Sequence, residues 1–213
     1  MQCRLPHRFI AVLLFLALPL PAAAAPADAV KESFLSYQAA LLNSNGERAA
    51  SAVTEGSRDL YREYADQALT LDRESLNSLH IADRLTVMLL RHSVDKQQLQ
   101  EMSGGEVIAH AIDEGWISKE GTGAIRLDHY EVNGDFATGT VLRPDGSATP
   151  FKLQFRKESG AWRLDLREML KLTRIGIEMT VQQTGMPEDD FILYLLEYST
   201  GRKPGPEIWN PPL

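Results

Sequence analysis

The chain has 213 residues, among them one cysteine, 22 basic residues and 29 acidic residues, and its formal net charge at pH 7 is −7. An acidic balance opposes binding to a phosphate backbone, which needs clustered Lys and Arg, so we do not expect a nucleic-acid partner. The length suits one domain with an ordinary apolar core.

The first 25 residues have the pattern of a secretion signal. Arg4 and Arg8 precede an apolar run over residues 9–18, and small residues follow in an Ala-x-Ala arrangement. This pattern predicts a signal peptide over residues 1–25 with cleavage near Ala25, and therefore a periplasmic or secreted protein. The apolar run is shorter than the roughly 20 residues that cross a bilayer, so we expect no membrane span.

Cys3 lies before the apolar run and leaves with the predicted leader, so residues 26–213 contain no cysteine. Disulfides, thiolate metal sites and a cysteine nucleophile are thereby excluded from the exported part. Loss of Arg4 and Arg8 leaves 20 basic residues against 29 acidic ones, a formal net charge of −9. Stability must come from an apolar core.

The first half of this part has the periodicity of helices. Apolar residues recur at helical spacing from Val30 to Leu41, and we expect this helix to end near Gly46 in a left-handed conformation. A short helix over 48–53 and a stripe through Leu60, Tyr64 and Ala68 follow.

Two further helices have clear start signals. Asp72 is typical of an N-cap, and we expect a long central helix from there to about Arg91. Ser103 and Glu106 have the spacing of a capping box, and Gly115 supplies the end of that helix.

After residue 123 the apolar period changes to two, which indicates strands. Four strands are predicted over 124–132, 136–143, 150–157 and 161–167, joined by turns rich in Asn, Asp, Gly and Pro. Tight turns predict an antiparallel meander. The last two strands have one dry face, on which we expect helices to pack, made of Phe151, Leu153, Phe155, Trp162, Leu164 and Leu166.

The order of these elements resembles that of the nuclear transport factor two-like superfamily, whose members share a cone-shaped α+β fold. The resemblance covers residues 30–167 and rests on the N-terminal helices and on a meander that carries VNGDFATGTV and ends in KESGAWRLDL. It implies N-terminal helices packed on a curved antiparallel sheet, forming a cone that is either open to a ligand or packed shut.

The chain continues beyond that pattern with two predicted helices over 168–200 and an extended tail over 201–213, all within a single domain over 26–213. The last helix is too apolar around Phe191 to Leu196 to lie in water. We expect it to plug the cone, to dock a partner, or to cover an apolar surface of the helix before it, made of Leu170, Ile175, Ile177 and Val181.

Chemistry-bearing motifs are few. No metalloprotease, nucleophile-elbow, phosphate-loop or dinucleotide motif occurs, so no cofactor is expected. Four histidines remain in the exported part, none at metal-ligand spacing with another, so no metal site is predicted; they are His80, His92, His110 and His129.

Three side chains are weak catalytic candidates, namely His129, His80 and Asp83. His129 would enter the cone if Ile125 and Leu127 face inward, and would then be a general base, but a solvated position at the rim is favoured. Asp83 lies one helical turn from His80, which suits an acid–base pair of the superfamily's dehydratase branch. A solvent-facing stripe balanced by nearby arginines is the favoured alternative.

Ile208 and Trp209 stand in a Pro-rich tail without a local partner. Either they fold back into a groove of the same domain, which we favour, or they anchor another protein.

The sequence leaves two classes of function open. The first is a non-enzymatic exported protein that binds an envelope protein or a small apolar ligand through the cone or the C-terminal helices. The second is a small cofactor-independent isomerase, dehydratase or hydrolase. The sequence leaves the oligomeric state open.

Overall fold

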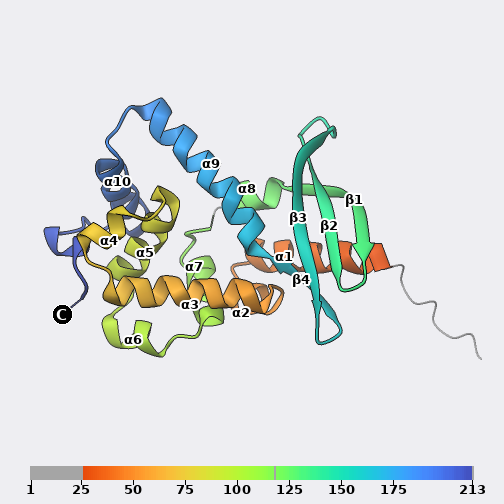
Figure 1. Cartoon of the computed structure of the whole chain (residues 1–213), viewed down its shortest axis with the longest axis horizontal. Coiled ribbons are helices and arrows are strands. Elements are labelled where there is room, and N and C mark those ends of the chain that lie inside the picture. Colours follow the sequence, from red (N-terminus) through yellow and green to blue (C-terminus); the bar gives the residue numbers. More distant parts are fainter. Residues whose placement is uncertain (1–25, 118, 213) are drawn as a thin grey trace, which may run out of the picture.

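A computed structural model describes residues 26–117 and 119–212 (Figure 1). The predicted signal peptide, its cleavage point and Cys3 lie outside these residues. The helices that precede the sheet are α1 (Pro26–Leu42), α2 (Gly46–Ser51), α3 (Glu55–Thr70), α4 (Arg73–Asn77), α5 (Ile81–Ser93), α6 (Lys96–Glu101), α7 (Gly104–Asp113) and α8 (Lys119–Ala124). In this part of the chain, no helix is both long and apolar enough to cross a membrane.

The sheet is an antiparallel meander in the order β1-β2-β3-β4, which confirms the predicted α+β class and topology. Its strands are β1 (Arg126–Asn133), β2 (Phe136–Leu142), β3 (Ala148–Glu158) and β4 (Ala161–Asp165). The predicted last strand was two residues too long, because Asp165 ends β4 and caps the next helix with its side chain.

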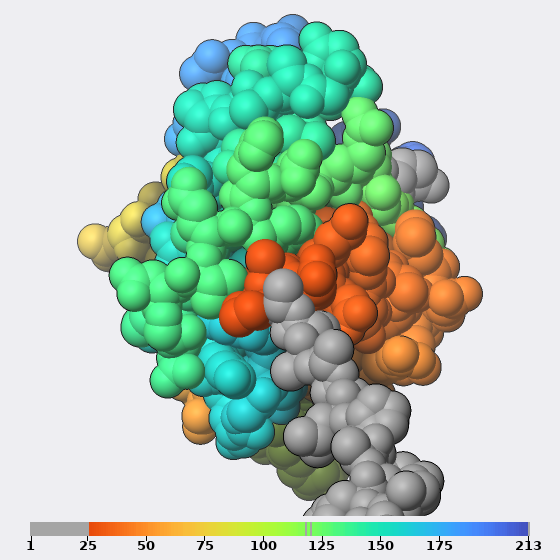
Figure 2. Space-filling model, turned by 90° about the vertical axis from the view of Figure 1, so that its right-hand side faces the viewer, coloured from red at the N-terminus to blue at the C-terminus, as the bar shows by residue number. Residues whose placement is uncertain are grey.

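The dry face of the sheet packs on the protein's own first helix. Leu153, Phe155 and Leu164 have no exposed surface, and the ring of Phe34 on α1 meets that of Phe155 edge-on at 6.3 Å between centroids. Figure 2 shows the start of α1, in red, at the surface between the sheet and the helices in orange. Phe151 was placed wrongly in this buried set, since it is 43% exposed.

The free edge of β4 is covered by the link between α2 and α3. Val53 forms a parallel bridge with Leu164, whose carbonyl accepts a 3.0 Å hydrogen bond from the amide of Thr54. The amide of Leu164 donates to the carbonyl of Ala52, also at 3.0 Å. The helical part of the molecule is thereby joined to the sheet through backbone hydrogen bonds.

The helices before the sheet pack at very short range. A Cβ on Gly46 would lie 2.2 Å from the carbonyl oxygen of Ala109, and one on Gly104 would lie 1.7 Å from that of Arg58. Gly46 is therefore needed for the approach of α2 to α7. In the turn between α1 and α2, the residue with a left-handed backbone is Ser44, with φ of 50°. The prediction that Gly46 has this conformation is therefore wrong.

The long central helix predicted from Asp72 is interrupted. Asp72 caps α4 as expected, but the helix ends at Asn77 and α5 begins only at Ile81. His80 is the second N-cap, because its Nδ1 accepts a 3.1 Å hydrogen bond from the amide of Ala82. The predicted capping box of Ser103 with Glu106 is confirmed at the start of α7.

Two helices follow the sheet, α9 (Leu166–Thr184) and α10 (Glu188–Thr200), and a short 3-10 helix, η1 (Pro206–Trp209), ends the described chain. α9 runs diagonally away from the sheet, and α10 returns beside the helices (Figure 1). Both α9 and α10 pack against α5. Of the α9 surface expected to be covered, Leu170, Ile177 and Val181 are half-buried against the core, but the expectation is wrong for Ile175, which is 46% exposed.

Candidate functional site

His129 lies at an irregularity in β1, where the register with β2 shifts between Asp128 and Glu131. Its φ is 51° and its side chain is exposed. The extra residue breaks the alternation, so Tyr130 shares the side of Leu127, and both approach Gly139. The inward position that a general base would need does not occur, and the imidazole is exposed to solvent.

His80 and Asp83 do not form a pair. The Nε2 atom of His80 lies 2.8 Å from a carboxylate oxygen of Glu178 on α9, while its other ring nitrogen caps α5. Asp83 is 8% exposed, so the expected solvent-facing position is wrong for it. Both side chains face α9, where they serve as contacts between helices.

Asp83 accepts hydrogen bonds from two other elements. The hydroxyl of Tyr64 on α3 donates to one carboxylate oxygen at 2.7 Å, and Arg174 on α9 donates to the other at 2.7 Å. Burial, followed by the hydrogen bond to Asp83, raises the pKa of Tyr64, so the phenol stays protonated. Burial acts to lower the pKa of Arg174, but Asp83 outweighs it and the pKa is raised. Both oxygens of this carboxylate are thus engaged by side chains of the protein, which makes Asp83 a structural contact between α3, α5 and α9.

The arginines expected to balance Asp83 bind elsewhere. Arg84 is 4% exposed, pairs with Glu188 at the start of α10, and donates to the side chain of Asn77 at 3.0 Å. Arg73 lies 3.0 Å from Asp189, also on α10. These contacts fasten the acidic start of α10 to α4 and α5.

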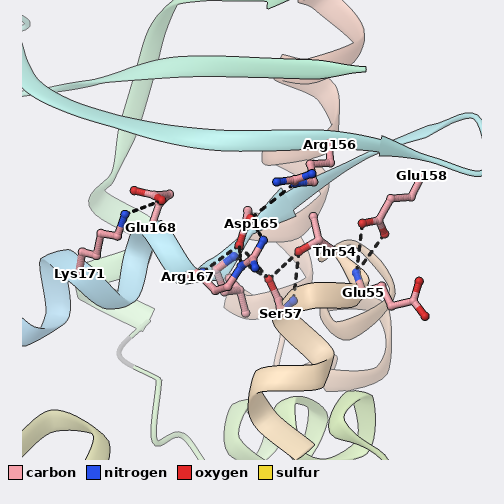
Figure 3. Close-up of polar contacts among 10 residues, drawn as sticks. Thr54, Glu55, Ser57, Arg156, Glu158, Asp165, Arg167, Glu168 and Lys171 are labelled. Atoms are coloured by element: carbon pink, nitrogen blue, oxygen red, sulfur yellow. Dashed lines mark hydrogen bonds and ion pairs between the residues drawn. The ribbon is translucent and has the colours of Figure 1, made fainter. Parts of the chain in front are cut away.

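A second buried carboxylate, Asp165, anchors the start of α9 (Figure 3). Asp165 is 2% exposed and accepts hydrogen bonds from the backbone amide and the Nε of Arg167, at 3.1 and 2.8 Å. Burial acts to raise the pKa of Asp165, but the hydrogen bonds and charge of Arg167 outweigh it and lower the pKa. The carboxylate therefore stays ionised and is a poor proton acceptor.

The hydroxyl of Ser57 completes this anchor, as Figure 3 shows. It accepts a 2.8 Å hydrogen bond from the amide of Leu166 and lies 2.8 Å from the hydroxyl of Thr54. No imidazole takes part in these contacts, so the serine lacks the base that a nucleophile requires. The cluster joins the first turns of α3 and α9. The Asp165–Glu168 spacing is that of an N-cap and its third helical residue, a signal in the sequence that the strand prediction obscured.

The most unusual surface of the molecule lies on α9. After Leu166, which is buried, seven apolar residues follow along this helix and none is buried; they are Met169, Leu170, Leu172, Ile175, Ile177, Met179 and Val181. The central charged residues Arg174 and Glu178 instead point to α5, where they meet Asp83 and His80. Of the seven apolar residues, Ile175 and Met179 face solvent, whereas Met169, Leu170, Leu172, Ile177 and Val181 are half-buried against the core. The inward side of α9 thus mixes apolar packing with the contacts of Arg174 and Glu178, and two large apolar side chains remain on its outer side.

The outward side of α9 carries an uncharged stripe at helical spacing, called here the outer stripe. It consists of the exposed residues Ile175, Gly176, Met179 and Gln183 and, at its start, of Leu172, which is half-buried against the core. Ile175 is 46% and Met179 is 53% exposed. A Cβ built on Gly176 would meet no atom within 4 Å, so no packing within the chain requires a glycine there.

α10 also exposes large side chains. Tyr194 and Tyr198 are 54% and 77% exposed, and their rings stack on each other at 6.2 Å between centroids. The opposite side of this helix is ordinary core, with Phe191, Ile192 and Leu196 buried.

Ile208 and Trp209 are buried in the same chain, at 5% and 6% exposure. Arg91 donates a 3.0 Å hydrogen bond to the carbonyl of Ile208, and the guanidinium of Arg73 lies 4.6 Å from the centre of the Trp209 ring. The tail thus folds back into its own domain, the arrangement that the sequence favoured over an anchor for a partner.

A shallow hollow of about 400 Å³ lies over α6 and α7, lined by Gln98, Glu101, Met102, Glu106, Ala109, His110 and Asp113. His110 packs edge-on against Trp116 at 5.1 Å between centroids. Glu106 and Asp113 accept backbone hydrogen bonds from Ser103 and Gly46, so their carboxylates serve the packing of the helices. Among the described residues, no group of three or more His, Cys, Asp or Glu side chains could hold a metal ion.

The remaining histidine, His92, also contacts the C-terminal part. Its Nε2 lies 3.0 Å from the backbone carbonyl oxygen of Arg202, and the guanidinium of Arg202 donates a 2.7 Å hydrogen bond to the backbone carbonyl of His92.

Comparison of the chain with models of known protein families, with curated proteins and with solved structures found no match. The geometry described above therefore carries the functional argument alone.

Proposed function

We propose that the protein is an exported, non-enzymatic binding or assembly protein that docks another polypeptide on the outer stripe of α9. The observation that carries this proposal is the exposure of Ile175 and Met179 on the outer side of α9, 46% and 53%, while Arg174 and Glu178 contact Asp83 and His80 of the protein. Exposed apolar patches of this kind are typical of interaction sites.

The polar side chains support the same class of function. His80, Asp83 and Asp165, whose side chains have the chemistry of acids or bases, are engaged in structural contacts with other side chains. His129 is exposed at a strand irregularity. The enzymatic alternative, an isomerase, dehydratase or hydrolase of the cone-shaped superfamily, has no arrangement of these residues in its favour.

The export part of the proposal rests on the leader pattern of residues 1–25. Mass spectrometry of the protein from the cell envelope should give a chain that begins near Pro26. A chain that retains the apolar run over residues 9–18 would contradict export by cleavage.

Photo-crosslinking in living cells tests the docking surface. A photoreactive residue at Met179 should yield covalent adducts with a polypeptide. The same residue at Asp145, which is exposed in the turn between β2 and β3, should not. Adducts from neither position, or equally from both, would contradict a docking role for the outer stripe.

A further inference from the structure

The outer stripe of α9 has the features of a surface that pairs with itself. We propose that its occupant is a second copy of this chain, with the two α9 helices crossing at Ile175 and Gly176 around a two-fold axis. This inference rests on the proposed docking function and names the partner. A two-fold interface must be complementary to itself, so each feature of the stripe has to find its match on the same stripe.

Shape is the first match. Ile175 projects from the helix, and the adjacent Gly176 leaves open space on the same side. In an antiparallel crossing centred between these residues, Ile175 of one copy packs over Gly176 of the other, and Leu172 meets Met179. An exposed mid-helix glycine lowers helix stability, and the close approach of a second helix is a reason for one at this place.

Charge is the second match. The stripe itself carries no charge, and the neighbouring Lys171 is paired with Glu168 of the same helix at 2.7 Å. In the crossing described, Lys171 lies opposite Thr180 and Glu178 lies opposite Thr173, so no like charges meet. Two copies with a formal charge of −9 each can approach here without the repulsion that most of their surface would give.

The same charges argue against a membrane as the occupant. A helix that lies on an anionic bilayer carries Lys and Arg along the border of its polar face. In α9 the central charged residues, Arg174 and Glu178, instead contact Asp83 and His80.

The number of residues in the outer stripe limits the affinity of the pairing. Five residues per copy are far fewer than the roughly 20 to 30 of a standard interface, so we expect a reversible dimer with a Kd on the order of tens of micromolar.

Sedimentation velocity of the purified protein, from about 1 to 300 µM, tests this pairing. The wild type should shift from monomer to dimer across that range. Met179→Glu should remain a monomer throughout, because it places a charge on the stripe. Tyr198→Glu is the matched control, a charge on an even more exposed residue of α10, and should dimerise like the wild type.

A cysteine trap gives an independent reading, since Cys3 is the chain's only cysteine and is replaced by Ser in each variant. Gly176→Cys lies next to the axis, where the two Cα atoms come within the roughly 7 Å that a disulfide spans. It should oxidise to a covalent dimer far faster than Tyr198→Cys. A wild type that stays monomeric over the whole range, or equal trapping at both positions, would overturn the pairing.

The two proposals fail in different ways. If the purified chain is a monomer while the photoreactive residue at position 179 captures a different polypeptide in cells, the self-pairing is wrong and the docking function stands. If position 179 captures nothing and no dimer forms, both are wrong. Crosslinks at twice the mass of the chain, together with the concentration-dependent dimer, support both.

Discussion

Arg174 on α9 donates hydrogen bonds to both carboxylate oxygens of Asp83 on α5, from Nη2 at 2.7 Å and from Nε at 3.3 Å. This contact fixes which side of α9 faces the protein. The contact adds to the packing of half-buried residues such as Leu170 and Ile177, and it leaves Ile175 and Met179 on the outer side of the helix.

Asp83→Ala tests that contact, because the change leaves the hydroxyl of Tyr64 and the guanidinium of Arg174 without their acceptor. Arg174 is 40% exposed, so water compensates part of the loss. We expect a loss of about 2 kcal/mol in the free energy of unfolding, measured by urea titration. Lys171→Ala, an exposed change on α9, is the control and should cost much less. Equal losses would mean that the contact is unimportant for stability.

Asp165→Asn should make the stability less dependent on pH. The folded-state pKa of Asp165 is lowered by Arg167 against the effect of burial. Its contribution is therefore fully present above about pH 5 and is lost as the pH falls through the folded-state pKa. The difference in unfolding free energy between wild type and variant should be about 2 kcal/mol at pH 7.

That difference should shrink as the pH is lowered from 5 towards 3. Urea titrations at several pH values give the curve for both proteins. Glu197→Gln, which removes an exposed carboxylate of α10, should leave the pH dependence close to that of the wild type. A difference for Asp165→Asn that grows on acidification would show that the sign is wrong.

Gly104→Ala and Gly105→Ala form a matched pair on neighbouring residues. A methyl group on Gly104 would overlap the backbone of Arg58, whereas one on Gly105 would first meet the flexible side chain of Arg58 at 3.4 Å. We expect Gly104→Ala to destabilise the protein by about 2 to 3 kcal/mol in thermal or urea unfolding. Gly105→Ala should be close to neutral. Similar effects of both would mean that α7 can move away from α3.

Trp209→Ala tests whether the tail belongs to the core. The ring is 6% exposed and lies under Arg73, so its removal leaves a cavity. We expect a loss of about 3 kcal/mol in unfolding free energy. Tyr198→Ala removes a similar ring that is 77% exposed and should have little effect. If Trp209→Ala is as stable as the wild type, the tail is not part of the core, and the alternative that it anchors a partner is favoured.

The sequence predicted elements well where local chemistry decides the conformation. The capping box of Ser103 and Glu106 needs only residues three apart, and the order of the strands follows from turns such as the one at Gly134. The predictions from sequence failed where a single residue interrupts the helical or strand periodicity of its neighbours. His80 caps α5 and so interrupts the predicted long helix. The irregularity at His129 shifts the register of β1 with β2, so the alternation of the side chains changes there.

The candidate site was missed because it depends on tertiary contacts. The apolar residues of α9, such as Ile175, are spaced as in any helix that packs on a core, so a last helix covering them was the natural expectation. Tertiary contacts show which residues face inward, among them Arg174 with Asp83, Glu178 with His80 and the packing of Ile177 against the core. The resemblance to the cone-shaped superfamily stays a prediction.

Solvent access to position 175 inside the cell tests the central claim most directly. Ile175→Cys and Tyr198→Cys, each with Cys3→Ser, can be labelled with a membrane-impermeant maleimide in the envelope of intact cells and again as dilute purified protein. The docking account predicts that position 175 labels several-fold more slowly in cells than in dilute solution, while position 198 labels equally in both. Equal labelling of position 175 in the two settings would contradict the claim that the outer stripe of α9 is covered by another polypeptide.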